Sequence, residues 1–150
     1  MDEYFEIKFV FRVNSYDELN ELPTNIHDGI KLEWIFDQKL KNLPENIHTL
    51  KLGICFNQKL ENLPENLHTL KSDICFDKKL ENLPNNLHTL KLGYKFNQKL
   101  ENLPDSLHTL QLGFVLRKKI NDEFNDLYTI ELKGTFNQKL ENLPNNLHYN

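Results

Sequence analysis

The chain has 150 residues, of which 39% are hydrophobic, and its formal net charge is −4. This length predicts a single domain, and the mildly acidic charge argues against a general affinity for nucleic acids or anionic membranes. Two cysteines do not make a disulfide framework, and no apolar run approaches the roughly 18 residues of a membrane span.

The N-terminal segment predicts a strand that precedes the repeats. In residues 4–13 (YFEIKFVFRV), apolar residues alternate with mostly polar ones, as in a strand with one buried face. We expect residues 1–14 to form a capping strand, because the ends of repeat stacks need cover. The acidic start MDEYFEIK lacks the pattern of a secretory signal, so we expect a cytoplasmic protein.

From residue 15 onwards the sequence repeats with a period of 20 residues. A phenylalanine opens most copies, and Leu116 takes its place in one. These phenylalanines are Phe36, Phe56, Phe76, Phe96 and Phe136. A fixed period of this size is typical of a solenoid, in which each repeat stacks on the next. We predict that residues 15–150 form about six to seven 20-residue repeats within a single domain.

Each repeat combines a short strand with an irregular return. In Thr49–Gly53, Leu50 and Leu52 alternate with outward-facing residues, which predicts a strand of about five residues. The leucines that follow Phe56 have helical spacing, but Pro64 lacks a backbone N–H and restricts the residue before it. We therefore predict a parallel sheet whose strands are joined by turns, 3₁₀ or coil, with little α-helix.

Three places depart from the regular repeat. Pro23 and Phe36 are 13 positions apart, against 12 for Pro44 and Phe56, which indicates an insertion at Asp28-Gly29. The stretch 116–135 has drifted most, although its core positions remain apolar. The last copy stops at residue 150, where its strand begins, and we expect an uncapped sheet edge there.

Several short motifs resemble the FNIP repeat family, which occurs in social amoebae and in giant viruses that infect amoebae. They are Phe56-Asn57-Gln58, Leu63-Pro64, Leu67-His68-Thr69-Leu70 and Leu52-Gly53. The resemblance covers residues 15–150 and implies a solenoid related to leucine-rich repeats (LRR). The chain departs from the family at Lys59, Lys99 and Lys139, where proline usually follows Phe-Asn-Gln. If the protein is viral, the resemblance implies the cytoplasm of the host cell.

Some relatives in this family carry an F-box before the repeats, which implies delivery of targets to a ubiquitin ligase. Here only the ten-residue strand segment 4–13 precedes the repeats, so we do not assign delivery to a ubiquitin ligase to this chain. Whether the chain serves such a pathway stays open.

Stacking would align equivalent residues into columns. We expect the asparagines at 42, 62, 82, 102 and 142 to satisfy backbone groups of the turns. We expect Asn57, Asn97 and Asn137, with Asp37 and Asp77, to cap a turn. Cys55 and Cys75 occupy one slot of adjacent coils, and we predict that both are small apolar fillers.

A column of histidines raises the question of a metal site. It comprises His48, His68, His88, His108 and His148, with Tyr128 in one slot. Zinc requires converging ligands, whereas a straight column offers one imidazole per coil. The alternative is a structural column at the strand entrance, bonded to neighbouring backbone, and Tyr128 favours it. We expect neither a metal nor a cofactor.

The exposed face of the strands is the candidate partner-binding site. Its residues are Thr49, Lys51, Thr69, Lys71, Asp73, Thr89, Lys91, Thr109, Gln111 and Glu131. The sheet faces of solenoids are common binding surfaces, but a merely solvated charged face is the alternative. A second lysine column is mostly followed, two residues later, by glutamate, so it is not net basic.

The sequence favours a non-enzymatic protein–protein interaction module of the FNIP type. It contains no paired acid and base, phosphate-binding glycine loop or nucleophile motif, so we expect no catalytic residues. We expect a protein partner, and no nucleic acid or membrane. The alternative is a structural or assembly protein that self-associates through its C-terminal sheet edge.

Overall fold

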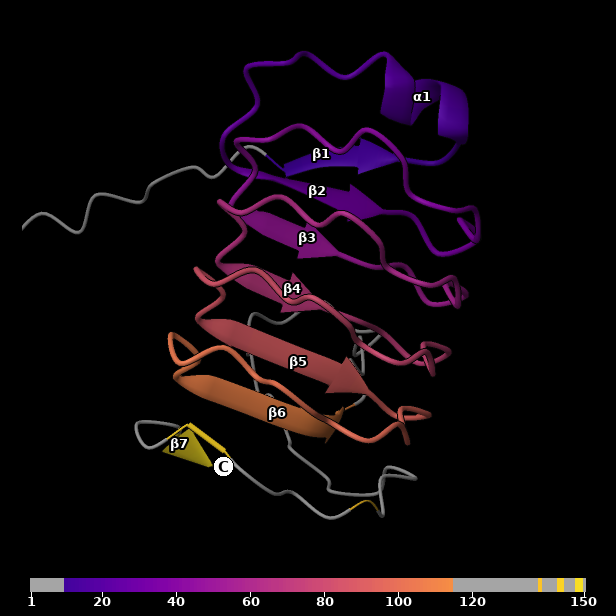
Figure 1. The fold of residues 1–150 in the computed structure, drawn as a ribbon. Helices are drawn as coiled ribbons and strands as arrows, with labels where there is room; N and C mark the ends of the chain where they lie inside the picture. The colour runs from indigo at the N-terminus through magenta and orange to yellow at the C-terminus, as the bar shows by residue number, and fades with distance from the viewer. Residues whose placement is uncertain (1–9, 115–137, 139–142, 145–147, 150) are drawn as a thin grey trace, which may run out of the picture.

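The computed structural model describes residues 10–114 and residues 138, 143, 144, 148 and 149. In this part of the chain, seven strands form one parallel sheet in chain order (Figure 1). They are β1 (Val10–Val13), β2 (Gly29–Leu32), β3 (Thr49–Lys51), β4 (Thr69–Lys71), β5 (Thr89–Gly93), β6 (Thr109–Phe114) and β7 (His148–Tyr149). The helix α1 (Tyr16–Asn20) follows β1. The predicted repeat solenoid with a parallel sheet and little helix is confirmed.

The period of the sequence sets the register of the sheet. Thr49 pairs with Thr69 and Lys51 with Lys71, so equivalent residues of successive repeats lie side by side. Leu50 between them is fully buried, while its two neighbours in the strand are partly exposed. The alternation in each strand therefore separates a core face from an outward face, as the sequence predicts.

The return segments are built from two β-turns and one left-handed residue. Phe56 N donates to Gly53 O at 3.2 Å, and Leu67 N donates to Pro64 O at 3.1 Å. Between these turns Asn62 has a φ of 52°. The chain thus reverses without a helix, as expected from Pro64.

The core is a stack of equivalent apolar layers. The rings of Phe36 and Phe56 lie 6.4 Å apart, and the next two spacings are 6.2 and 6.1 Å. Phe56 and Phe76 are fully buried, together with the strand leucines. Each repeat therefore covers the apolar surface of the next, as stacking requires.

Two of the predicted asparagine functions differ in the structure. Asn57 N donates to Asp37 Oδ1 at 2.8 Å, so this column links adjacent coils and does not cap its own turn. The column of Asn62 is exposed and left-handed. A different asparagine bonds the backbone of the adjacent coil. Asn66 Nδ2, for example, donates to Glu45 O at 3.1 Å.

The predicted insertion in the first repeat is visible in the backbone bonds. His68 N and Thr69 N both donate to His48 O, whereas Thr49 N donates to Asp28 O. Asp28 is therefore the extra residue, and β2 regains the common register at Gly29.

The C-terminal end departs from the period. Thr109 of β6 pairs with His148 of β7, a separation of 39 positions where two 20-residue periods would give 40. Gln138 Nε2 also donates to Asn97 Oδ1 at 3.3 Å, a contact between residues 41 positions apart. Residues 115–137 and 1–9, including most of the predicted capping strand, lie outside the described residues.

Candidate functional site

The outward face of β3–β6 brings the predicted site residues into two parallel columns. Thr49, Thr69, Thr89 and Thr109 pair across neighbouring strands and form one column. The other contains Lys51, Lys71, Lys91 and Gln111. All eight side chains are partly buried. Glu131 lies outside the described residues.

The lysine column continues beyond the predicted site. Lys31 pairs with Lys51, and Arg12 of β1 pairs with Lys31. We call Arg12, Lys31, Lys51, Lys71 and Lys91 the basic stripe. Sequence reasoning missed Arg12 as a member, although its alternation with Val13 placed it on the outward face.

Two carboxylates lie beside the basic stripe. Glu33 Oε1 is 3.6 Å from Arg12 Nη1 and 4.0 Å from Lys31 Nζ, and this buried oxygen has no hydrogen-bond partner among the described residues. Burial raises the pKa of Asp73, while a hydrogen bond from the Ile74 backbone and the charge of Lys31 oppose that rise. The N-terminal half of the stripe is therefore partly neutralised by acidic side chains.

Glycines occupy the position of Asp73 in the two neighbouring repeats. A Cβ on Gly53 would collide with the backbone carbonyl of Glu33, and one on Gly93 would collide with that of Asp73. Glu33, Gly53, Asp73 and Gly93 occupy equivalent positions of successive repeats. Acidic side chains therefore alternate with glycines along this column. Next to Asp73, Ser72 is buried in a slot that holds leucine in adjacent repeats, and its Oγ accepts a hydrogen bond from Gly93 N at 3.1 Å.

The first turn of each return exposes apolar side chains next to this face. The exposed fractions are 65% for Trp34, 69% for Ile35 and 36% for Tyr94. We define the apolar corner as the set Trp34, Ile35, Ile54, Cys55, Ile74, Cys75 and Tyr94. Cys55 is exposed and Cys75 is partly buried, so the prediction that Cys55 is a small apolar filler was wrong. A turn places these residues at a surface corner, which the sequence pattern did not reveal.

Backbone hydrogen bonds hold the apolar corner together from one repeat to the next. Cys55 N donates to Trp34 O at 2.8 Å, and Cys75 N donates to Ile54 O at 3.0 Å. Lys95 N continues the series by donating to Ile74 O at 3.1 Å. The corner is therefore a continuous edge along the sheet.

The histidine column lies at the other end of the strands, where each imidazole precedes a threonine. The rings of His48 and His68 stack at 4.8 Å, those of His68 and His88 at 4.9 Å, and His88 meets His108 edge-on at 5.4 Å. The rings thus contact one another across the coils. In the described part of the chain, no group of three or more His, Cys, Asp or Glu side chains is arranged to hold a metal ion.

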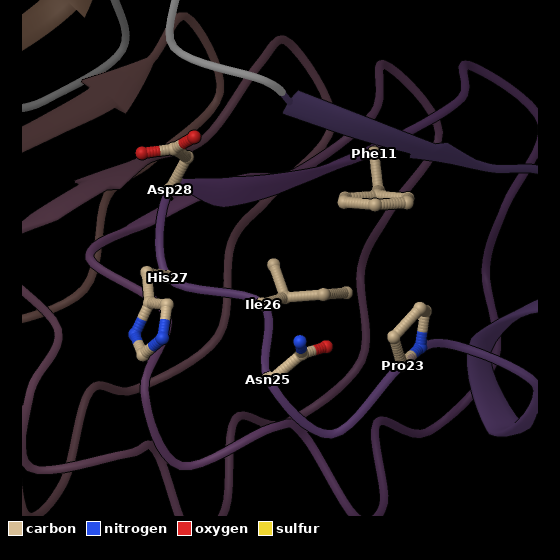
Figure 2. Close-up of a pocket in the computed structure, with 6 residues that line it drawn as sticks. All are labelled: Phe11, Pro23, Asn25, Ile26, His27 and Asp28. Atoms are coloured by element: carbon tan, nitrogen blue, oxygen red, sulfur yellow. The ribbon is translucent and has the colours of Figure 1, made fainter.

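A shallow pocket of about 260 Å³ lies at the N-terminal end of the stack. Figure 2 shows Phe11 projecting from β1 toward Ile26 and Pro23, with Asn25, His27 and Asp28 around them. Phe11 pairs with Ile30, a core position, and is 39% exposed because no described strand lies beyond β1. The pocket is the end of the hydrophobic core rather than a separate polar site.

Comparison with known proteins supports the resemblance noted in the sequence. Residues 76–114 match the FNIP repeat family. The chain is also similar to a solved structure, described as CroV588, a novel circular LRR protein, from a giant virus. The identity is 36%, the TM-score is 0.65, and the match covers 86% of this chain and 17% of that one.

The resemblance to FNIP repeats and the LRR-like fold are thus confirmed. The chain spans about 17% of the length of the solved structure that it matches. Among curated proteins, none matches the sequence. Within the described residues, no helix is long and apolar enough to cross a membrane.

Proposed function

We propose that this run of FNIP repeats is a non-enzymatic protein–protein interaction module, which binds a protein partner along the outward face of β3–β6. The observation that carries the proposal is the register of the sheet, which aligns the threonines of four strands, and the lysines of three of them, into continuous columns. Such a face is larger than any single repeat could offer, and extended sheet faces are characteristic binding surfaces of solenoids. The repeat family and the LRR-like neighbour support a role in protein interaction.

The chemistry of the face suits a polypeptide ligand. Threonine hydroxyls such as those of Thr69 and Thr89 both donate and accept hydrogen bonds, and the lysines donate. The side chains of Lys51, Lys71 and Lys91 are partly buried along the sheet, so their methylene stems contribute apolar contact. We propose that binding takes place in the cytoplasm, as expected from the sequence.

Charge reversal of the face tests this proposal. The variant Lys51→Glu, Lys71→Glu, Lys91→Glu should lose the proteins that the wild type captures from the native cytosol, because it inverts the charge of the columns. Its matched control, Lys39→Glu, Lys41→Glu, Lys78→Glu, changes exposed lysines of the return segments by the same charge and should retain them. Quantitative mass spectrometry of the captured proteins is the measurement, with thermal melting as the check of folding. Equal capture by the folded face variant and the control would contradict the proposal.

Self-association is the second candidate, and the sheet edges favour it. β7 is the last strand of the sheet and β1 the first, so each has one side without a strand among the described residues. The LRR neighbour is described as circular and this chain matches 17% of it, which favours an end-to-end continuation of the sheet. Light scattering coupled to size exclusion tests this idea. A molar mass that rises with protein concentration supports assembly, and a constant monomer contradicts it.

A further inference from the structure

We infer that the partner segment is acidic and carries apolar side chains, and that it lies across the strands with its acidic residues on the basic stripe and its apolar residues on the apolar corner. The inference rests on the proposed function, since it specifies the ligand of the same face. It adds to that face a second surface, the apolar corner, which the sequence did not predict.

The distribution of charge supports an acidic ligand. The chain as a whole has a net charge of −4. Among the described residues, the outward face nevertheless carries the five cations of the basic stripe, against the two carboxylates Glu33 and Asp73 in the column beside it. Like charges aligned on neighbouring strands destabilise a sheet, so an additional negative charge placed on this face is stabilising. An acidic segment supplies that charge and is steered to the face by the cations of the basic stripe.

The apolar corner supports a ligand with apolar anchors. Trp34 and Ile35 are about two-thirds exposed, which is an unusual environment for large apolar side chains. They continue into the partly buried Ile54 and Ile74 and then into Tyr94. Exposed aromatic and aliphatic side chains that form a continuous edge are typical of interaction surfaces, and tryptophan and tyrosine dominate the energy of such contacts.

Only two residues of each repeat separate the basic stripe from the apolar corner, so one ligand can contact both surfaces. Between Lys51 and Ile54 lie Leu52, which is buried in the core, and Gly53, which has no side chain. The same arrangement recurs at Leu92 and Gly93 in the repeat after next. Gly53 and Gly93 pack against the backbone carbonyls of Glu33 and Asp73. At these two repeats no side chain therefore projects between the basic stripe and the apolar corner.

Two other occupants fit these observations less well. A second copy bound face to face would oppose one basic stripe to another, which is unfavourable because like charges repel across an interface. An anionic membrane would also attract a basic and aromatic surface, but the net charge of −4 opposes its approach.

Selection from random peptides displayed on phage tests the inference. The wild-type protein should enrich peptides that combine Asp or Glu with aromatic or aliphatic residues. The corner variant Trp34→Ser, Ile54→Ser should weaken the binding of a selected peptide about tenfold or more, because two apolar anchors are lost. Its conservative control, Trp34→Phe, Ile54→Val, should bind nearly as well as the wild type. The stripe variant Lys51→Ser, Lys91→Ser should no longer select acidic residues, whereas Lys39→Ser, Lys41→Ser should still select them.

Each outcome separates this inference from the proposed function. Enriched peptides that depend on the stripe lysines but lack acidic or apolar residues, or that ignore the corner variant, would refute the inference and leave the proposed face intact. Peptides that bind all variants equally, or no enrichment at all, would count against both. Binding to phosphatidylserine vesicles that the stripe and corner variants abolish would assign the surface to lipid and also overturn the inference.

Discussion

At the scale of single residues, the asparagine that precedes the Leu-Pro pair in four successive repeats determines how the return segment bends. Asn42, Asn62, Asn82 and Asn102 have φ values of 52–55°, in the left-handed region. Asparagine and glycine adopt this conformation at low cost, whereas other residues with a Cβ pay roughly 1–2 kcal/mol. This conformational requirement explains the recurrence of asparagine at an exposed position.

Substitutions at Asn82 test this explanation. We expect Asn82→Ala to lower the free energy of unfolding by about 1 kcal/mol, because alanine resists a positive φ. Asn82→Gly should be nearly neutral, since glycine accepts that conformation. Asn85→Ala, at an exposed turn position of the same repeat, is the control and should have little effect. Urea denaturation measures all three, and equal losses for Asn82→Ala and Asn82→Gly would contradict the explanation.

Asp73 predicts a dependence of stability on pH. Burial raises its pKa above the ordinary value of 3.8, so the folded protein binds the proton more tightly than the unfolded chain does. The ionised carboxylate therefore costs stability at neutral pH, and this cost is removed as the pH falls through the raised pKa. Asp73→Asn should be more stable than the wild type at neutral pH, with the difference shrinking toward acid pH. Urea denaturation at a series of pH values measures it, and a difference independent of pH would contradict the assignment.

At the scale of elements, the coils are joined by ladders of polar side chains on the return side. Lys59 Nζ lies 3.7 Å from Glu61 Oε1 and 3.2 Å from Glu81 Oε2, and Lys79 Nζ bridges Glu81 and Glu101 in the same way. Each of these lysines thus contacts a glutamate of its own coil and a glutamate of the next coil. This second lysine column is neutralised by its glutamates, as the sequence predicted.

Glu81→Gln tests this ion-pair ladder. The hydrogen bond from Lys59 and the charge of the same group lower the pKa of Glu81 below its ordinary value of 4.5. The pairing therefore stabilises the fold above that value, and its contribution is lost as the pH falls through the lowered pKa. We expect a small decrease in Tm at neutral pH that vanishes in acid and in high salt, because the groups are exposed. Glu65→Gln, at an exposed turn, should leave Tm unchanged. An equal loss at every pH would contradict the ladder.

At the scale of the whole molecule, stability depends on contacts between residues one period apart. The parallel pairing from β2 to β6 and the phenylalanine stack both connect each coil only to its neighbours. A structure of this kind has a stability that is roughly the sum of its repeats and their interfaces. Its length is therefore adjustable in units of one repeat.

Deletions within the repeats test this modularity. Removal of residues 57–76, one full period, joins Phe56 to Asp77 and keeps every column in register. We expect this variant to unfold cooperatively with a moderately lower Tm, because one coil and one interface are lost. Removal of residues 57–66, half a period, shifts the columns and should abolish the fold. Circular dichroism melting distinguishes the two, and equal damage by both deletions would contradict the modular description.

Much of this architecture was predictable from the sequence, because the relevant information recurs every 20 residues. The alternation around Leu50 predicted the strand, and Pro64 predicted a return without a helix. The lysine and threonine columns of the candidate site followed from the same period. Each of these features is local, since it depends on side-chain direction and backbone chemistry within one repeat.

Other features depended on how the coils meet. The tertiary structure showed that Arg12 extends the basic stripe, that Asn57 bonds to the preceding coil, and that β7 follows β6 in the sheet. It also placed Cys55 at an exposed corner, where the sequence suggested a small apolar filler. By itself the sequence therefore determined the repeating unit and its inner and outer faces, since these follow from alternation within one coil. Only the tertiary structure decided which side chains of different coils become neighbours, because those contacts depend on the packing of successive turns.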